Sequence, residues 1–173
     1  MGAGHFCDLS EGFAGGGLSK FYQRSLQRVQ DERDTAIEIV AYVRNNWYSK
    51  SLFDEAGFQL GRSLNDTIQL GENLDAIFII RLFATFEGIL KEHMQQHHPS
   101  FPIRDEVKVS LLIDRVAVSQ NARIVTALCN KVHEVRQYHN SLVHPNDRPI
   151  DEITFTEGLA RLARYVGWLP EPR

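Results

Sequence analysis

The residues best suited to chemistry lie together near the C-terminal end of the chain, in the stretch Arg136-Gln-Tyr-His-Asn-Ser-Leu-Val-His-Pro145. An arginine binds phosphate through a planar, permanently charged fork, and histidines transfer protons near neutral pH. On a helix, Arg136, Asn140 and His144 form a slowly drifting row on one face, so they can converge on one ligand. The stretch therefore predicts either an acid–base site for a phosphate ligand or a basic helix end, in which His144 only caps the last carbonyls.

His139 lies on a different face of the same helix. Its stripe is otherwise apolar and should pack inward, with Leu128, Val132, Val135 and Leu142 as the other members. A histidine on such a stripe is more often a satisfied core or interface residue than a catalyst. We therefore expect His139 to pack toward the rest of the domain.

The segment Tyr138-His-Asn-Ser-Leu-Val-His-Pro145 resembles the signature of the HEPN domains. These are all-α modules whose motif is an arginine, often followed directly by asparagine, and then a histidine a few residues later. Asn140 and His144 match that frame, and His139 stands in the place of the arginine. The resemblance covers the helical order from about Asn73 to Leu169, and it implies that His144 transfers protons during metal-independent cleavage of RNA.

In active members of that family the arginine holds the scissile phosphate, so its replacement by His139 leaves three alternatives. In the first, Arg136 binds the phosphate in place of the motif arginine. In the second, His139 and His144 form an acid–base pair for attack of a ribose 2′-hydroxyl on its neighbouring phosphate. In the third, the site is degenerate and binds RNA without cutting it. The family also commonly carries an acidic residue facing the motif, which implies that role for Glu87. The other interpretation of Glu87 is an ion pair with Lys91, four residues further along the helix.

These residues give a hypothesis for function: a metal-independent endoribonuclease that leaves a 2′,3′-cyclic phosphate and a 5′-hydroxyl. Its catalytic residues are His144, His139 and Arg136, its substrate-binding residues are Asn140 and Glu87, and it uses no cofactor and no metal. The resemblance is closest to stand-alone bacterial HEPN proteins of RNA-targeting defence and toxin systems. It implies RNA as the partner, a homodimer in which two motifs face one cleft, and an antitoxin protein as a further partner. The alternative is a catalytically degenerate module for RNA binding or dimerisation.

The spacing of apolar residues along the chain predicts an all-α bundle of about five helices with one irregular insertion, and these helices must position the residues above. Residues 1–17 read as a flexible leader and residues 18–173 as a single domain. Apolar residues at helical spacing predict helices over about 18–46, 73–97, 105–118, 121–144 and 156–169. Glycines interrupt this pattern over residues 47–72, where the sequence predicts the insertion with short extended pieces. The segment 73–97 is the most apolar, which places it in the middle of a bundle or at a dimer seam.

Composition narrows the classes of protein further. A chain of 173 residues is long enough for one domain with its own core. Its net charge of −3 argues against a broad basic surface that binds nucleic acid, so any such surface must be a local basic groove. Its two cysteines, Cys7 and Cys129, argue against a disulfide framework and favour a reducing, cytoplasmic setting. The sequence shows neither a signal peptide nor an apolar run long enough for a membrane span, so we expect no membrane partner.

Three further histidines have the spacing of metal ligands, with His93 and His97 one helical turn apart and His98 next in sequence. Met94 follows His93 in the place where a zinc protease keeps its general-base glutamate. We therefore interpret this cluster as the exposed end of a helix. Cys129 is interpreted as a small core residue.

Overall fold

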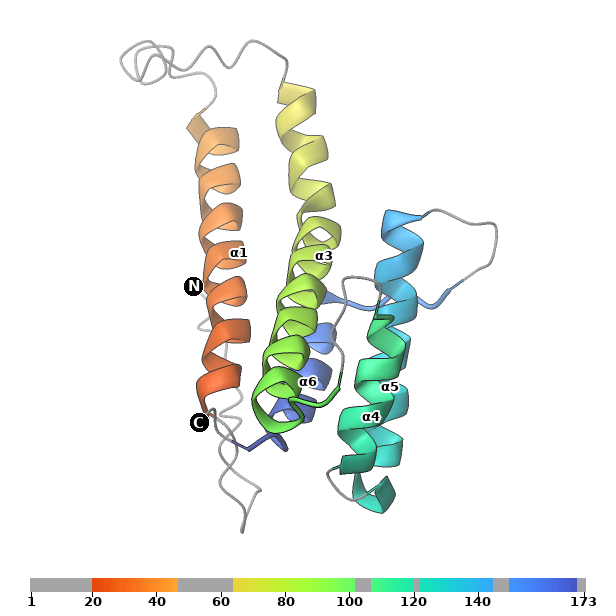
Figure 1. The fold of residues 1–173 in the computed structure, drawn as a ribbon. Helices are drawn as coiled ribbons and strands as arrows, with labels where there is room; N and C mark the ends of the chain where they lie inside the picture. Colours follow the sequence, from red (N-terminus) through yellow and green to blue (C-terminus); the bar gives the residue numbers. More distant parts are fainter. Residues whose placement is uncertain (1–19, 47–63, 102–106, 120–121, 145–149, 171–173) are drawn as a thin grey trace.

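The computed structural model describes residues 20–46, 64–101, 107–119, 122–144 and 150–170. Within these ranges the chain forms five α-helices and no strand, which confirms the predicted all-α bundle (Figure 1). None of these helices is long and apolar enough to cross a membrane. The helices are α1 (Lys20–Asn46), α3 (Leu64–His97), α4 (Val109–Ser119), α5 (Ala122–Val143) and α6 (Phe155–Val166).

Helix α3 lies at the centre of the bundle. It runs antiparallel beside α1, while α4 and α5 form a second pair on its other side and α6 lies behind it (Figure 1). Helix α3 contacts each of the other four, whereas α1 contacts only α3 and α6 among the described segments. This position follows from composition, because the helix is apolar around most of its circumference and many of its side chains are buried: Leu82, Phe83, Phe86, Ile89, Leu90 and Met94.

Helix α3 begins at Leu64 and not near Asn73, so the insertion with short extended pieces, expected over residues 47–72, is wrong for residues 64–72. The glycine that suggested a break, Gly71, lies inside the helix. A Cβ added there would lie 3.3 Å from Cγ1 of Val40 on α1, which is tighter than ordinary packing. Glycine at this position thus allows the two helices to approach closely, and that contact outweighs its low helix propensity. The leader 1–17 and residues 47–63 of the expected insertion lie outside the described residues.

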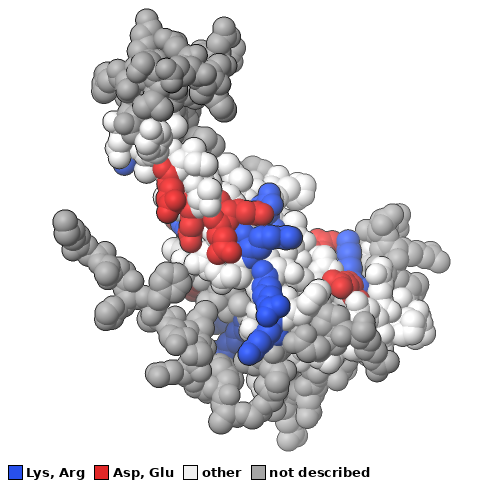
Figure 2. Space-filling view, turned by 90° about the vertical axis from the view of Figure 1, so that its left-hand side faces the viewer, with Lys and Arg blue, Asp and Glu red and all other residues white. Residues whose placement is uncertain are grey.

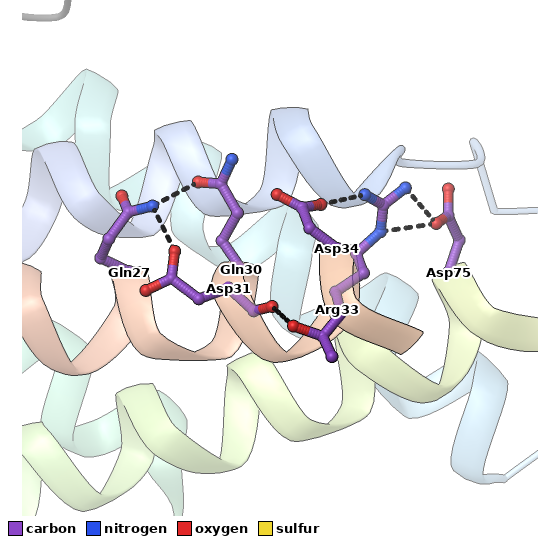
Figure 3. A network of polar contacts seen from close by, with 7 residues as sticks. Gln27, Gln30, Asp31, Arg33, Asp34 and Asp75 are labelled. Atoms are coloured by element: carbon purple, nitrogen blue, oxygen red, sulfur yellow. Dashed lines mark hydrogen bonds and ion pairs between the residues drawn. The ribbon is translucent and has the colours of Figure 1, made fainter. Parts of the chain in front are cut away.

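A polar network joins α1 to α3 (Figure 3). Arg33 of α1 donates from Nε and Nη2 to Oδ1 of Asp75 on α3, over 2.9 and 2.7 Å. The same guanidinium lies 4.8 Å above the ring of Phe155, at the start of α6. Because only 18% of the Arg33 side chain is exposed, this one residue fixes three helices relative to one another.

Helix α6 is held at both ends. Thr154 caps its N-terminus by accepting a hydrogen bond from the backbone N–H of Glu157 over 3.3 Å. Near its other end, the buried hydroxyl of Tyr165 donates to the carbonyl of Ile113 on α4 over 2.7 Å. Helix α6 therefore connects α1 and α3 with the α4–α5 pair, which carries the motif.

The outer face of α1 carries charges of both signs. Lys20, Arg24 and Arg28 are exposed on its first half, and the exposed acidic residues Asp31 and Asp34 follow them. Figure 2 looks onto this side of the molecule and shows an acidic group of side chains above a run of basic ones. This face offers no uniform basic surface for nucleic acid, in keeping with the net charge of −3.

Candidate functional site

Asn140 connects the two histidines of the motif, close to the C-terminal end of α5. Its side-chain Oδ1 lies 3.2 Å from Nδ1 of His139. Its backbone carbonyl accepts a hydrogen bond from the N–H of His144 over 2.8 Å, and this bond closes the final turn of the helix. Because Oδ1 is an acceptor, Nδ1 of His139 carries the ring proton and Nε2 keeps a lone pair.

His139 packs inward, as its stripe predicts. Its ring stacks on Phe83 of α3, with centroids 4.7 Å apart and an angle of 27° between the planes. Burial lowers the pKa of His139, and the nearby charge of His144 lowers it further, while the bond to Asn140 and the charge of Glu87 act in the opposite direction. His139 is therefore neutral near pH 7, with Nε2 available as a base.

His144 and Arg136 have different surroundings. His144 is exposed at the end of α5. Arg136 is half-buried two turns earlier, and its Nε donates to Nδ1 of His133 over 3.4 Å. Arg136, the candidate to replace the motif arginine, is thus hydrogen-bonded to His133 of the same helix. The structure shows no contact between Arg136 and His144.

Glu87 fits both interpretations made from the sequence. Its carboxylate forms an ion pair with Lys91 over 2.7 Å, at the expected spacing of four residues. It also lies close enough for its charge to raise the pKa of His139. Glu87 is therefore an acidic neighbour of His139 on the facing helix, and Lys91 holds it there.

A second polar cluster, which the sequence does not reveal, lies between α4 and α5. Oδ1 of Asp114 is 2.9 Å from Nε2 of His133 and 3.6 Å from Sγ of Cys129. Cys129 is buried, as expected of a core residue, and burial together with the charge of Asp114 raises the pKa of its thiol to about 11. The spacing of Cys129 and His133, one helical turn, is visible in the sequence; the approach of Asp114 from another helix is not.

The interpretation of the His93 cluster as an exposed helix end is wrong. His93 has no exposed surface, and its ring stacks on that of His97 with centroids 4.6 Å apart. Neither ring nitrogen of His93 has a hydrogen-bond partner among the described residues, and its pKa is lowered to about 4, mainly by burial and then by the charges of His97 and His98. The reason is periodicity: His93 lies three and seven residues after Leu90 and Phe86, so it continues the buried stripe of α3.

One surface pocket of about 480 Å³ lies between α5, α6 and residues 150–153. Its lining carries four acidic and two basic residues, and Arg161 pairs there with Glu134 over 2.7 Å. None of the five residues predicted from the motif lines it. Because a phosphate would be repelled by this lining, the pocket does not extend the motif site.

Comparisons with known proteins add no support to the resemblance to HEPN domains, which depends on the motif residues of α5 and on Glu87 alone. No protein-family model matches the chain, no curated protein matches it, and no solved structure matches it.

Proposed function

We propose that this chain is a metal-independent endoribonuclease of the HEPN type, in which His139 is the general base and His144 the general acid. The observation that carries the proposal is the position of His139, whose Nδ1 lies 3.2 Å from Oδ1 of Asn140 and whose pKa is affected by the charge of His144. A neutral histidine and a second histidine near one phosphate are sufficient for transesterification of RNA.

In the proposed reaction, Nε2 of His139 removes the proton of a ribose 2′-hydroxyl, and the oxygen attacks the adjacent phosphorus. The bond from phosphorus to the 5′-oxygen breaks, and that oxygen takes a proton from His144. The products are a 2′,3′-cyclic phosphate and a 5′-hydroxyl. After one turnover His139 is protonated and His144 is neutral, so exchange of protons with water restores the starting state.

Local electrostatics support this division of roles. His139 is the residue whose pKa is lowered by burial, which favours its neutral form before reaction. Glu87 then stabilises the imidazolium that forms on His139. His144 is exposed directly after the last turn of α5, where the leaving 5′-oxygen of a bound RNA can reach it.

The test is cleavage of a mixed-sequence RNA by the purified protein in EDTA, with His139→Gln and His144→Gln beside it. We expect each variant to lose about 100-fold or more in rate, the typical contribution of one acid–base group. His98→Gln is the matched control, because it replaces a half-buried histidine just beyond α3 and far along the chain from the motif. Equal cleavage by all four proteins would mean that the activity comes from a contaminant or from other residues, and the proposal would be abandoned.

We further propose that the working form is a homodimer and that an antitoxin protein regulates it, as the resemblance implies. Val143, directly before His144, leaves 41% of its surface exposed, so Val143→Asp tests whether a second copy packs beside the motif. Light scattering should give twice the 19.8 kDa chain mass for the native protein and a smaller mass for Val143→Asp. A native protein that stays monomeric at assay concentration would remove the dimer from the proposal while leaving the chemistry.

A degenerate module that binds RNA without cutting it is the second candidate. The observation in its favour is that both charged helpers are engaged elsewhere, Arg136 with His133 and Glu87 with Lys91. This candidate predicts that native protein and His144→Gln both shift RNA in a gel and that neither cuts it.

A further inference from the structure

We infer that Asp114, Cys129 and His133 form a binding site for one divalent transition-metal ion, with Zn²⁺ as the favoured occupant. The site is separate from the proposed RNA chemistry, which uses no metal. A thiolate, an imidazole and a carboxylate are the three side-chain ligands that zinc takes in proteins, and three such ligands leave a fourth position for water. Magnesium and calcium are disfavoured because a thiolate and an imidazole are poor ligands for hard cations.

Two of the three pairs of ligand atoms are already close to the separations that zinc requires. One atom from each residue lies within 4.8 Å of the other two. Zinc bond lengths with tetrahedral angles require about 3.3 to 3.7 Å between ligand atoms. The separation of Cys129 Sγ from Asp114 Oδ1, 3.6 Å, falls in this range, and the separation of His133 Nε2 from the same oxygen, 2.9 Å, needs only a small increase.

The backbone supports the cluster from two helices that pack together. Cys129 and His133 are one turn apart on α5, so their side chains project from the same face. Asp114 approaches from α4, which packs against α5. Exposure increases from Cys129, which is buried, through His133 to Asp114, so the cluster has a dry inner side and an outer side that solvent reaches.

The charges balance once the metal is bound. The thiol of Cys129 gives up its proton, as coordination requires, and with the carboxylate of Asp114 it supplies two negative charges to one Zn²⁺. His133 stays neutral and carries its proton on Nδ1 when Nε2 binds the metal. Arg136 must then give up its hydrogen bond to Nδ1, which costs little because that bond is long, 3.4 Å.

The experiment uses the full chain, freed of metal with a chelator that is then removed, and titrated with Co²⁺ as a spectroscopic substitute for Zn²⁺. We expect one Co²⁺ per chain, a thiolate-to-cobalt charge-transfer band in the near ultraviolet, and the visible bands of tetrahedral cobalt. Zn²⁺ should displace the Co²⁺ and raise the thermal unfolding midpoint, since it binds the native chain.

The chain offers a matched pair of cysteine variants. Cys129→Ser should lose the charge-transfer band, while Cys7→Ser should keep it with unchanged stoichiometry. His133→Gln and Asp114→Asn should weaken Co²⁺ binding by more than about 100-fold, since removing even the outer partners of a ligand costs about 10- to 100-fold. These two variants keep the test decisive if Cys129→Ser fails to fold, because both residues lie nearer the surface.

Three results would overturn the inference: no stoichiometric Co²⁺ binding by folded protein, a charge-transfer band that follows Cys7, or binding that Cys129→Ser, His133→Gln and Asp114→Asn leave unchanged. The last result would place the metal elsewhere, and His97→Gln would show whether the His93 cluster holds it. RNA cleavage is assayed in EDTA, so failure of the metal site and failure of the nuclease proposal are distinguishable.

Discussion

Replacing His93 by leucine should remove a large part of the pH dependence of stability. In the folded protein the pKa of His93 is lowered from 6.5 to about 4, and its ring is completely buried. The unfolded chain therefore binds one more proton than the folded chain between these two values. Stability from this residue is fully present above about pH 7 and is lost as pH falls through the folded pKa.

The size of the loss follows from the same two values. The difference, 6.5 minus about 4, is about 2.5 pH units, and each unit is worth about 1.4 kcal/mol, so the full loss is about 3.5 kcal/mol. About 2 kcal/mol of it should already be lost at pH 5, where the unfolded ring is nearly all protonated and the folded ring is not. Because His97 and His98 remain in place in His93→Leu, the difference between native protein and variant isolates the buried ring.

The measurement is urea unfolding followed by far-ultraviolet circular dichroism at pH 7.5, 6, 5 and 4.5. The native protein should lose about 2 kcal/mol more than His93→Leu between pH 7.5 and pH 5. His98→Gln keeps the buried ring of His93 and removes only the last-named of the three causes that lower its pKa, so it should lose nearly as much stability as the native protein. Parallel curves for the native protein and His93→Leu would show that His93 is not buried in a neutral form, and the reasoning would be refuted.

Three other substitutions test separate parts of the structure. Phe83→Leu should let water reach His139 and raise its pKa toward 6.5 in an NMR titration; an unchanged titration would contradict the stacking as a cause of burial. Thr154→Ala should cost about 0.5–2 kcal/mol in urea unfolding through loss of the α6 cap, and no cost would mean that the cap is not formed in solution. Gly158→Ala and its control Gly88→Ala should both raise the thermal midpoint, because each gains about 0.5–1 kcal/mol of helix propensity and a Cβ at residue 158 meets only ordinary contacts, the nearest 3.8 Å away. A destabilised Gly158→Ala beside a stabilised Gly88→Ala would show that the space at residue 158 is not available.

Residues that lie on a strong apolar stripe could be placed from the sequence. The pattern predicted the central position of α3 and the inward position of His139, since both follow from helical spacing alone. The start of α3 was missed because Gly71 reads as a break when its contact with Val40 is unknown. His93 lies on the same buried stripe as Phe86 and Leu90, but a polar residue type near a helix end is typical of an exposed position, so its burial could not be predicted from residue type.

Contacts between side chains of two different helices could not be predicted from the sequence. Asp114 belongs to α4, and its approach to Cys129 and His133 follows from how α4 and α5 pack. The hydrogen bond from Arg136 to His133 joins residues only three apart in sequence. The direction of the Arg136 side chain nevertheless depends on which of several neighbouring partners the folded structure brings near it. The catalytic roles of His144, His139 and Arg136, and the substrate-binding roles of Asn140 and Glu87, stay predictions.

The hydrogen bond from Arg136 to His133 also makes one side chain common to two proposed sites. A metal bound at Asp114, Cys129 and His133 would displace Arg136 from His133. Arg136 is on the same helical row as Asn140 and His144, so the displaced side chain would be free to bind a phosphate of the proposed RNA substrate. Thermodynamic linkage requires the effect to be reciprocal: by whatever factor Zn²⁺ tightens RNA binding through Arg136, RNA must tighten Zn²⁺ binding by the same factor. Helix α5 would then act as a two-input element, in which the occupancy of each ligand depends on the concentration of the other.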